Sequence, residues 1–126
     1  MKATVMEDKM ENRNIMKELY QYVDDKNING LESLLAENVH FRLGNFESVR
    51  GLKNVLEANT SFFKSIESMK HQIDNIWQEK NDVICNGKVE YIRLDGSKHS
   101  ITFASILTII DGKIDNYLVY ADVSKL

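Results

Sequence analysis

The segment from Lys98 to Ile110 constrains the fold most, because it is apolar on both faces of an extended strand. One face carries Ile101, Phe103, Leu107 and Ile109, and the other carries Ala104, Ile106 and Ile110. A strand that is buried on both sides lies in the middle of a sheet and is covered twice. We therefore expect helices on one face of this sheet. A second copy of the chain is the simplest cover for the other face.

The rest of the second half also predicts strands. Apolar alternation favours strands over residues 69–78, 83–93 and 113–123, with hairpin turns at Asp95-Gly96 and Asp111-Gly112. The first of these strands places Met69, His71, Ile73, Asn75 and Trp77 on one face. Asn86-Gly87 interrupts the second strand, and we interpret it as a β-bulge because a turn there would divide a good strand.

The first half of the chain predicts three helices and one short strand. Between Glu11 and Lys26, apolar residues recur every four positions, which is typical of an amphipathic helix. Asn29 is the expected cap of a second, short helix, and a third helix follows Gly51. A short strand, residues 39–43, alternates apolar and polar side chains between the second and third helices. Helices followed by antiparallel strands indicate the α+β class.

Length and composition bound the remaining possibilities. A chain of 126 residues with 43% hydrophobic content fits one domain, residues 1–126, in which 1–10 are a candidate loose N-terminal extension. No two of the 16 basic residues are adjacent and the net charge is −3, so we expect no nucleic-acid partner. No apolar run approaches the roughly 20 residues of a membrane span, so no membrane partner is expected. The single cysteine, Cys85, and the lack of a visible signal segment favour the cytoplasm.

Three short sequence segments carry a family resemblance. They are the segment 29–39 (NGLESLLAENV), the segment 69–73 (MKHQI), and DGKI at 111–114 followed by YAD at 120–122. In this order and spacing, the chain resembles the SnoaL-like polyketide cyclases within the nuclear transport factor 2-like superfamily. The resemblance implies a curved, cone-shaped mixed or antiparallel sheet packed against three N-terminal helices. It also implies an apolar pocket in the cone and a homodimer formed through the sheet.

The resemblance and the residue pattern together suggest an acid/base pair. The SnoaL-type cyclases use an aspartate on the last strand, and Asp122 falls on that position. By alternation Asp122 shares a face with Leu118 and Tyr120, so burial would raise its pKa toward neutrality. His71 lies on an apolar face and is the expected partner across the pocket. The alternatives stay open: Asp122 as a solvated strand end, and His71 as a core histidine bonded to a carbonyl or to Asp122.

Other positions depart from the activities that the superfamily hosts. Leu43 stands where the ketosteroid isomerases of the superfamily carry a carboxylate, and Ser105 stands where they carry an oxyanion-stabilising acid. The first-helix tyrosine of those enzymes falls nearest Leu19, although Tyr20 and Tyr22 are close. The Asp-Arg-Asp set of the epoxide hydrolases is matched only by Arg93 and Asp95 at a turn. Steroid isomerase chemistry is therefore not expected.

Aromatic side chains supply the expected pocket wall. The candidate ligand-binding residues are Trp77, Phe103, Tyr120, Ser105, Tyr20, Phe41 and Phe63. Such residues are most often core, but in a cone the core and the pocket lining are the same surface. The three histidines lack metal-ligand spacing, so neither a metal nor another cofactor is expected.

Three functions remain open from the sequence. One is a cofactor-independent enzyme of the cyclase or isomerase type, acting on a compact apolar substrate that carries an oxygen. Another is a binding module with the same pocket and no turnover, and the third is a protein-interaction adaptor. Polar groups that converge in apolar surroundings favour a small-molecule pocket over the adaptor.

Overall fold

The computed structural model describes the backbone of residues 2–126 and the side chains from residue 12 onward. The elements in chain order are α1 (Lys2–Asp24), α2 (Ile28–Leu34), β1 (Leu35–Leu43), β2 (Val49–Arg50), α3 (Leu52–Lys64), β3 (Ile66–Glu79), β4 (Asp82–Arg93), β5 (Lys98–Ile110) and β6 (Lys113–Tyr120). The side chains of residues 1–10 lie outside the described part, and a loose extension there stays a prediction.

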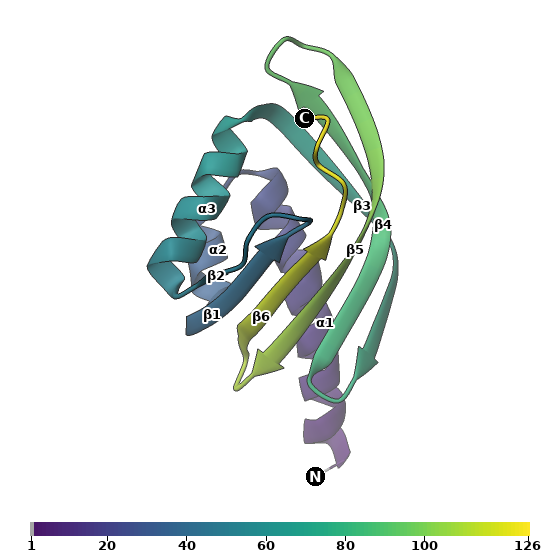
Figure 1. The fold of residues 1–126 in the computed structure, drawn as a ribbon. Helices are drawn as coiled ribbons and strands as arrows, with labels where there is room; N and C mark the ends of the chain where they lie inside the picture. The colour runs from purple at the N-terminus through teal and green to yellow at the C-terminus, as the bar shows by residue number, and fades with distance from the viewer. Residues whose placement is uncertain (1) are drawn as a thin grey trace.

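One six-stranded sheet, in the order β2-β1-β6-β5-β4-β3, forms one wall of the molecule. Neighbouring strands are antiparallel except for β1 and β6, which are parallel, so the sheet is mixed. The sheet curves, and all three helices cover its concave face (Figure 1). The expected α+β class and the curved sheet are confirmed, and β5 lies inside the sheet between β4 and β6.

The N-cap of the second helix lies two residues earlier than expected. Asn27 is the N-cap, and its side-chain oxygen accepts a hydrogen bond from the backbone N–H of Gly30 at 2.9 Å. Asn29 lies inside α2 instead. A side-chain acceptor is needed there because the first amides of a helix lack intrahelical partners.

A β-bulge in β3 changes which side chains face the helices. Ile73 pairs with Gly87 and Asn75 pairs with Asn86, so Asp74 is an extra residue without a partner on β4. A Cβ on Gly87 would lie 1.9 Å from the carbonyl oxygen of Gln72, which explains why glycine stands there. The expected bulge therefore occurs at Gly87, but the additional residue belongs to the opposite strand.

A second bulge, in β6, has the same effect. Ile109 pairs with Ile114 and Thr108 pairs with Asn116, which leaves Asp115 as the extra residue. Ile114 and Tyr117 are therefore both buried, although they are three positions apart. Because side chains alternate strictly in an unbroken strand, each bulge reverses the faces of the residues that follow it.

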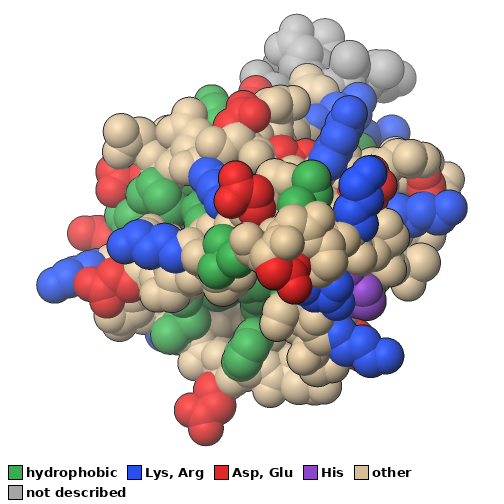
Figure 2. Space-filling model, turned by 90° about the horizontal axis from the view of Figure 1, so that it is seen from above, with side chains coloured by type: hydrophobic (Ala, Val, Ile, Leu, Met, Phe, Trp, Pro, Cys, Tyr) green, Lys and Arg blue, Asp and Glu red, His purple; other side chains and the backbone are tan. Residues whose placement is uncertain are grey.

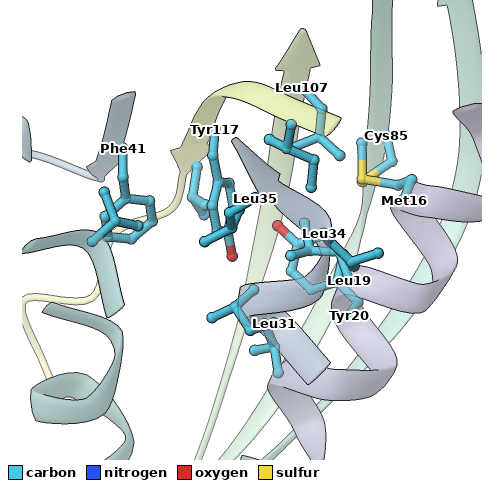
Figure 3. Close-up of a cluster of buried hydrophobic side chains, with 14 of the residues drawn as sticks. Met16, Leu19, Tyr20, Leu31, Leu34, Leu35, Phe41, Cys85, Leu107 and Tyr117 are labelled. Carbon is cyan, nitrogen blue, oxygen red and sulfur yellow. The ribbon is translucent and has the colours of Figure 1, made fainter. Parts of the chain in front are cut away.

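The hydrophobic core lies between the concave face and the helices. Its members include Met16 and Leu19 from α1, Leu31 from α2, and Cys85 and Leu107 from the sheet (Figure 3). None of the described helices is long and apolar enough to cross a membrane.

Candidate functional site

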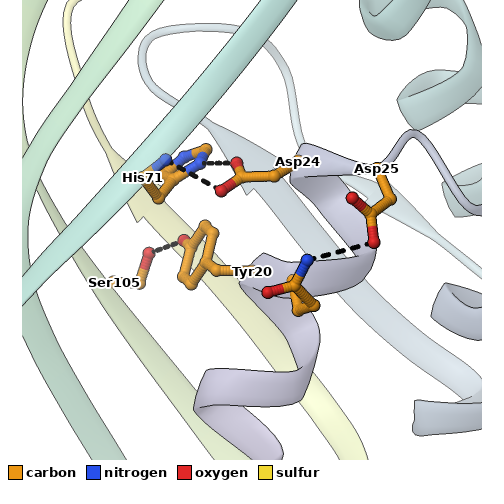
Figure 4. A network of polar contacts seen from close by, with 6 residues as sticks. Tyr20, Asp24, Asp25, His71 and Ser105 are labelled. Carbon is orange, nitrogen blue, oxygen red and sulfur yellow. Dashed lines mark hydrogen bonds and ion pairs between the residues drawn. The ribbon is translucent and has the colours of Figure 1, made fainter.

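A histidine and an aspartate meet on the concave side of the sheet. Asp24 is the last residue of α1, and His71 lies on β3. The Asp24 carboxylate contacts the ring Nδ1 of His71 at 2.5 Å and accepts a second hydrogen bond, of 2.9 Å, from the backbone N–H of His71 (Figure 4). One carboxylate therefore fixes both the position and the ring orientation of the histidine.

Aromatic rings surround this pair. The His71 ring lies 4.4 Å from the Tyr20 ring and 5.0 Å from the Phe103 ring, measured between centroids. The side chain of His71 is 6% exposed and that of Asp24 is 19% exposed. Because surroundings that exclude water strengthen hydrogen bonds, this enclosure favours the contact between the carboxylate and the ring.

A second buried polar contact lies beside the first. The hydroxyl of Tyr20 bonds to the hydroxyl of Ser105 on β5, and both residues are buried (Figure 4). Burial raises the pKa of Tyr20 well above that of a free phenol, and it raises the pKa of Tyr117 and Tyr91 in the same direction. The concave side thus holds three phenols that stay neutral, and can donate a proton to a hydrogen bond, throughout the physiological pH range.

An apolar pocket of about 320 Å³ opens between α3 and the end of β1, and we call it the mouth pocket. Its lining residues are Phe41, Leu43, Phe46, Glu47, Val49, Ala58, Ser61, Phe62 and Ser65. The volume is at the lower end of the range for small-molecule sites.

Two aromatic residues lie between the mouth pocket and the polar pair. Phe62 lines the pocket and contacts Tyr91 edge to face, with ring centroids 6.2 Å apart. The charge of Asp24 contributes, after burial, to the raised pKa of Tyr91, so this phenol lies close to the pair. His71 itself does not line the mouth pocket.

Asp122 lies outside this arrangement, which corrects the expected pairing with His71. Strand β6 ends at Tyr120, and Asp122 belongs to the exposed C-terminal segment. Its carboxylate accepts hydrogen bonds from the backbone N–H and the hydroxyl of Ser124, at 3.1 and 2.6 Å. These two bonds lower the pKa of Asp122, opposite to the expected rise.

Trp77 and Tyr120 also lie away from the concave side, at 49% and 46% exposure. Each follows one of the two bulges, which turn their side chains to the outer face of the sheet. The guanidinium of Arg42 lies 5.4 Å from the centre of the Tyr120 ring and donates to its hydroxyl at 3.1 Å. Unbroken alternation predicts both aromatic side chains in the wall of an inner pocket, and neither of them is there.

The other expected site residues divide between three places. Phe103, Ser105 and Tyr20 lie together beside His71. Phe41 is in the wall of the mouth pocket, and Phe63 is a buried core residue of α3.

Asp24 is the residue that the sequence analysis missed. It lies near the C-terminal end of the segment that the periodicity predicts to be the first helix, and its own residue type does not show which way it faces. Met16, Tyr20 and Asp24 follow one another at intervals of four, so all three lie on one face of α1. The apolar character of Met16 and Tyr20 on that face is the signal in the sequence that Asp24 also faces the sheet.

Other hollows of the described chain differ in size and lining. One of about 600 Å³ lies along α3, beside Leu52, Leu56 and Glu57. Another of about 440 Å³ lies beside Arg42, Tyr120 and Asp122. Among the side chains from residue 12 onward, no group of three His, Cys, Asp or Glu residues is placed to hold a metal ion. Acidic and basic side chains are intermixed on the surface that Figure 2 presents.

Comparison with known proteins identifies relatives by family and by fold. A SnoaL-like domain model matches residues 16–117. A candidate SnoaL-like polyketide cyclase from Jannaschia sp. CCS1 superposes with a TM-score of 0.81 at 12% identity, covering 91% of this chain and 88% of that chain. An LEH-like epoxide hydrolase from M. tuberculosis superposes with a TM-score of 0.79 at 13% identity, covering 91% of this chain and 85% of that chain. A nuclear transport factor 2-like protein from Burkholderia pseudomallei K96243 superposes with a TM-score of 0.83 at 14% identity, covering 91% of this chain and 93% of that chain. No curated protein matches the sequence.

Proposed function

This chain belongs to the SnoaL-like domain family, and on that premise we propose that it binds a compact, mostly apolar molecule on its concave side and moves a proton on it with His71. The observation that carries the proposal is the contact between His71 and Asp24 inside an aromatic enclosure. A histidine held by a carboxylate is a recurrent general base of enzymes. Relatives of the same fold include a candidate polyketide cyclase and an epoxide hydrolase, which supports small-molecule chemistry as the general class.

The geometry assigns distinct roles to the two ring nitrogens of His71. Because the Asp24 carboxylate can only accept a hydrogen bond, the ring proton lies on Nδ1, and Nδ1 donates the hydrogen bond to Asp24. Nε2 then has a free lone pair, and none of the described side chains forms a hydrogen bond with it. Nε2 is therefore the atom that would accept a proton from a bound substrate.

The proposed reaction returns the proton to the substrate. Nε2 of His71 takes a proton from an acidic C–H or O–H group, and Asp24 stabilises the imidazolium that forms. The imidazolium then donates the proton to another atom of the same molecule. The net change is an isomerisation, a ring closure or, if a hydroxyl leaves with the proton, a dehydration, and none of these steps needs a redox cofactor.

Access to His71 is proposed to run through the mouth pocket. The apolar part of the substrate would occupy that pocket, and the reacting end would point toward Tyr91. Rotation of Phe62 is required, since it lies between the pocket and Tyr91. Aromatic side chains at pocket throats rotate on timescales far shorter than typical turnover.

A second candidate function is binding without turnover. It is favoured by the tight enclosure of His71, whose side chain is 6% exposed and packed between the rings of Tyr20 and Phe103. In that case the pair holds α1 against β3 and performs no chemistry.

One experiment separates the two functions. A thermal-shift screen of aromatic and terpenoid compounds finds ligands, and mass spectrometry and NMR then follow each ligand for conversion. For a converted ligand, His71→Asn is expected to retain binding and lose roughly 10²–10⁴-fold in turnover. Asp25→Asn, at the exposed neighbour of Asp24, is the control and should keep full turnover. Conversion that persists in His71→Asn contradicts the proposed chemistry, and ligands that bind without conversion favour the binding module.

We also propose a homodimer formed through the outer face of the sheet. One cross-strand row on that face joins Trp77, Ile84, Ile106, Leu118 and Arg42 from five strands. Four of these five side chains are apolar, and a second copy of the same row is a self-complementary partner.

The lone buried thiol of the chain fits a reducing compartment, so the cytoplasm is the proposed location.

A further inference from the structure

We infer that the mouth pocket selects neutral ligands over carboxylates, and that Glu47 is the residue that sets this preference. The inference rests on the proposed use of the mouth pocket as the ligand site and adds the chemical class of the ligand. Its starting point is the contrast between the apolar walls of the pocket and the single charged residue in its lining.

The walls suit a flat or compact hydrocarbon body. Phe41 and Phe62 face the pocket from β1 and α3, and Val49 and Ala58 complete the apolar surface. Phe41 also packs against Tyr117, with ring centroids 4.7 Å apart, so its ring is supported from behind. Aromatic walls of this kind favour ring-containing ligands.

The polar groups of the pocket accept hydrogen bonds more readily than they donate them. Ser65 already donates its hydroxyl proton to the carbonyl oxygen of Phe62 at 2.6 Å. Ser61 is the remaining hydroxyl, and Glu47 contributes the only carboxylate. A ligand hydroxyl can donate to Glu47, whereas a ligand carboxylate meets a like charge.

The arginine of the neighbouring hollow, Arg42, does not enter the mouth pocket. Arg42 lines the adjacent hollow, which shares Phe46 with the mouth pocket, but it is absent from the lining of the mouth pocket. Its guanidinium is held over the Tyr120 ring and bonded to the Tyr120 hydroxyl. Glu47 is therefore the one charged side chain in the lining of the mouth pocket, and its charge is negative.

The test compares two probes that share one ring system. The first, 2-naphthol, is neutral at pH 7, and the second, 2-naphthoate, is an anion. Fluorescence titration gives the Kd of each probe for the wild-type chain, for Glu47→Gln and for Glu57→Gln. Glu57 lies on α3 and lines a different hollow but not the mouth pocket, so Glu57→Gln reproduces the change in net charge without changing the lining of the mouth pocket.

We expect wild type to bind 2-naphthol more tightly than 2-naphthoate. The ratio of the Kd of 2-naphthoate to the Kd of 2-naphthol should fall about fivefold in Glu47→Gln, which is the upper range for an exposed charge pair. The same ratio should stay unchanged in Glu57→Gln. Raising the salt concentration should reduce the ratio in wild type toward that of Glu47→Gln. Ala58→Leu, which fills the pocket, should abolish binding of both probes.

The contrary results point to different failures. If 2-naphthol binds and Ala58→Leu blocks it but the ratio is unchanged in Glu47→Gln, the selectivity inference is wrong and the ligand site stands. If wild type binds neither probe, or if Ala58→Leu leaves binding intact, the mouth pocket is not the ligand site and the inference is overturned. The role of His71 is judged separately, by the turnover measurement described above.

Discussion

Asp24 holds His71 at two atoms, the ring Nδ1 at 2.5 Å and the backbone N–H at 2.9 Å. The pair joins the end of α1 to β3, which is an edge strand of the sheet. Lys26 strengthens the same junction, because its Nζ donates to the carbonyl oxygens of Ile66 and Glu67 at 2.8 and 2.9 Å. The same carboxylate thus holds the helix against the sheet and orients the histidine to which we assign the proposed proton transfer.

Asp24→Asn should destabilise the fold by about 1–3 kcal/mol. The amide can accept one of the two hydrogen bonds but carries no charge, and the second donor of His71 is left poorly satisfied in a mostly buried setting. Denaturant unfolding followed by circular dichroism measures the change. Asp25→Asn removes an exposed carboxylate that bonds only Gln21, so it should stay within about 0.5 kcal/mol of wild type. Equal effects of the two variants would contradict the structural importance of the pair.

Gly87→Ala should destabilise the protein by several kcal/mol, roughly 3 or more. The new Cβ would lie 1.9 Å from the carbonyl oxygen of Gln72, and this is a backbone atom that cannot rotate away. The neighbouring substitution Asn86→Ala, which removes an exposed hydrogen bond to Asn75, should be nearly neutral. A midpoint of thermal unfolding for Gly87→Ala near that of wild type would show that the bulge is absent or differently placed.

The sequence predicted the element types well and the faces of two strands poorly. Periodicity located the helices and long strands because each element follows one repeat over many residues. The faces of β3 and β6 depend on Asp74 and Asp115, and each bulge reverses every later position. Gly87 signalled a bulge, but nothing in the sequence indicates that the extra residue belongs to the opposite strand.

The same two bulges explain the outcome for the candidate site. His71 and Ile73 precede the bulge of β3, and His71 faces the helices, whereas Trp77 follows the bulge and faces outward. Tyr120 follows the bulge of β6 in the same way. The partner of His71 comes from α1, and such a contact depends on how a helix docks on a sheet, which local alternation does not encode.

Cys85 should be unreactive in the folded protein. Burial raises its thiol pKa from 9.0 to about 12, so the reactive thiolate is scarce at pH 8. Ellman's reagent should label it only after unfolding in guanidinium chloride, and rapid labelling of the native chain would contradict the burial.

The raised pKa of Cys85 also predicts a pH dependence of stability. The unfolded thiol ionises near pH 9 and the folded thiol near pH 12, so its contribution is complete below pH 9 and is lost as the pH rises through that interval. Ionisation of this thiol lowers the free energy of unfolding by at most about 1.4 kcal/mol per pH unit. Cys85→Ala should remove this part of the alkaline destabilisation, and an unchanged slope in that variant would assign it to other groups.

Trp77 gives a direct readout of the proposed dimer, because it is the only tryptophan and lies on the outer face of the sheet at 49% exposure. Association would remove the indole from water, so its fluorescence emission should shift to longer wavelength on dilution as the dimer dissociates. Sedimentation at micromolar concentration should give about twice the chain mass of 14.6 kDa. Ile106→Lys places a charge in the middle of the cross-strand row and should give a folded monomer, because an unpaired buried charge opposes association. Asn29→Lys, on an exposed position of α2, adds the same charge on the helical side and should leave the dimer intact. A wild-type chain that sediments as a monomer, with an emission maximum that does not change with concentration, would contradict the dimer.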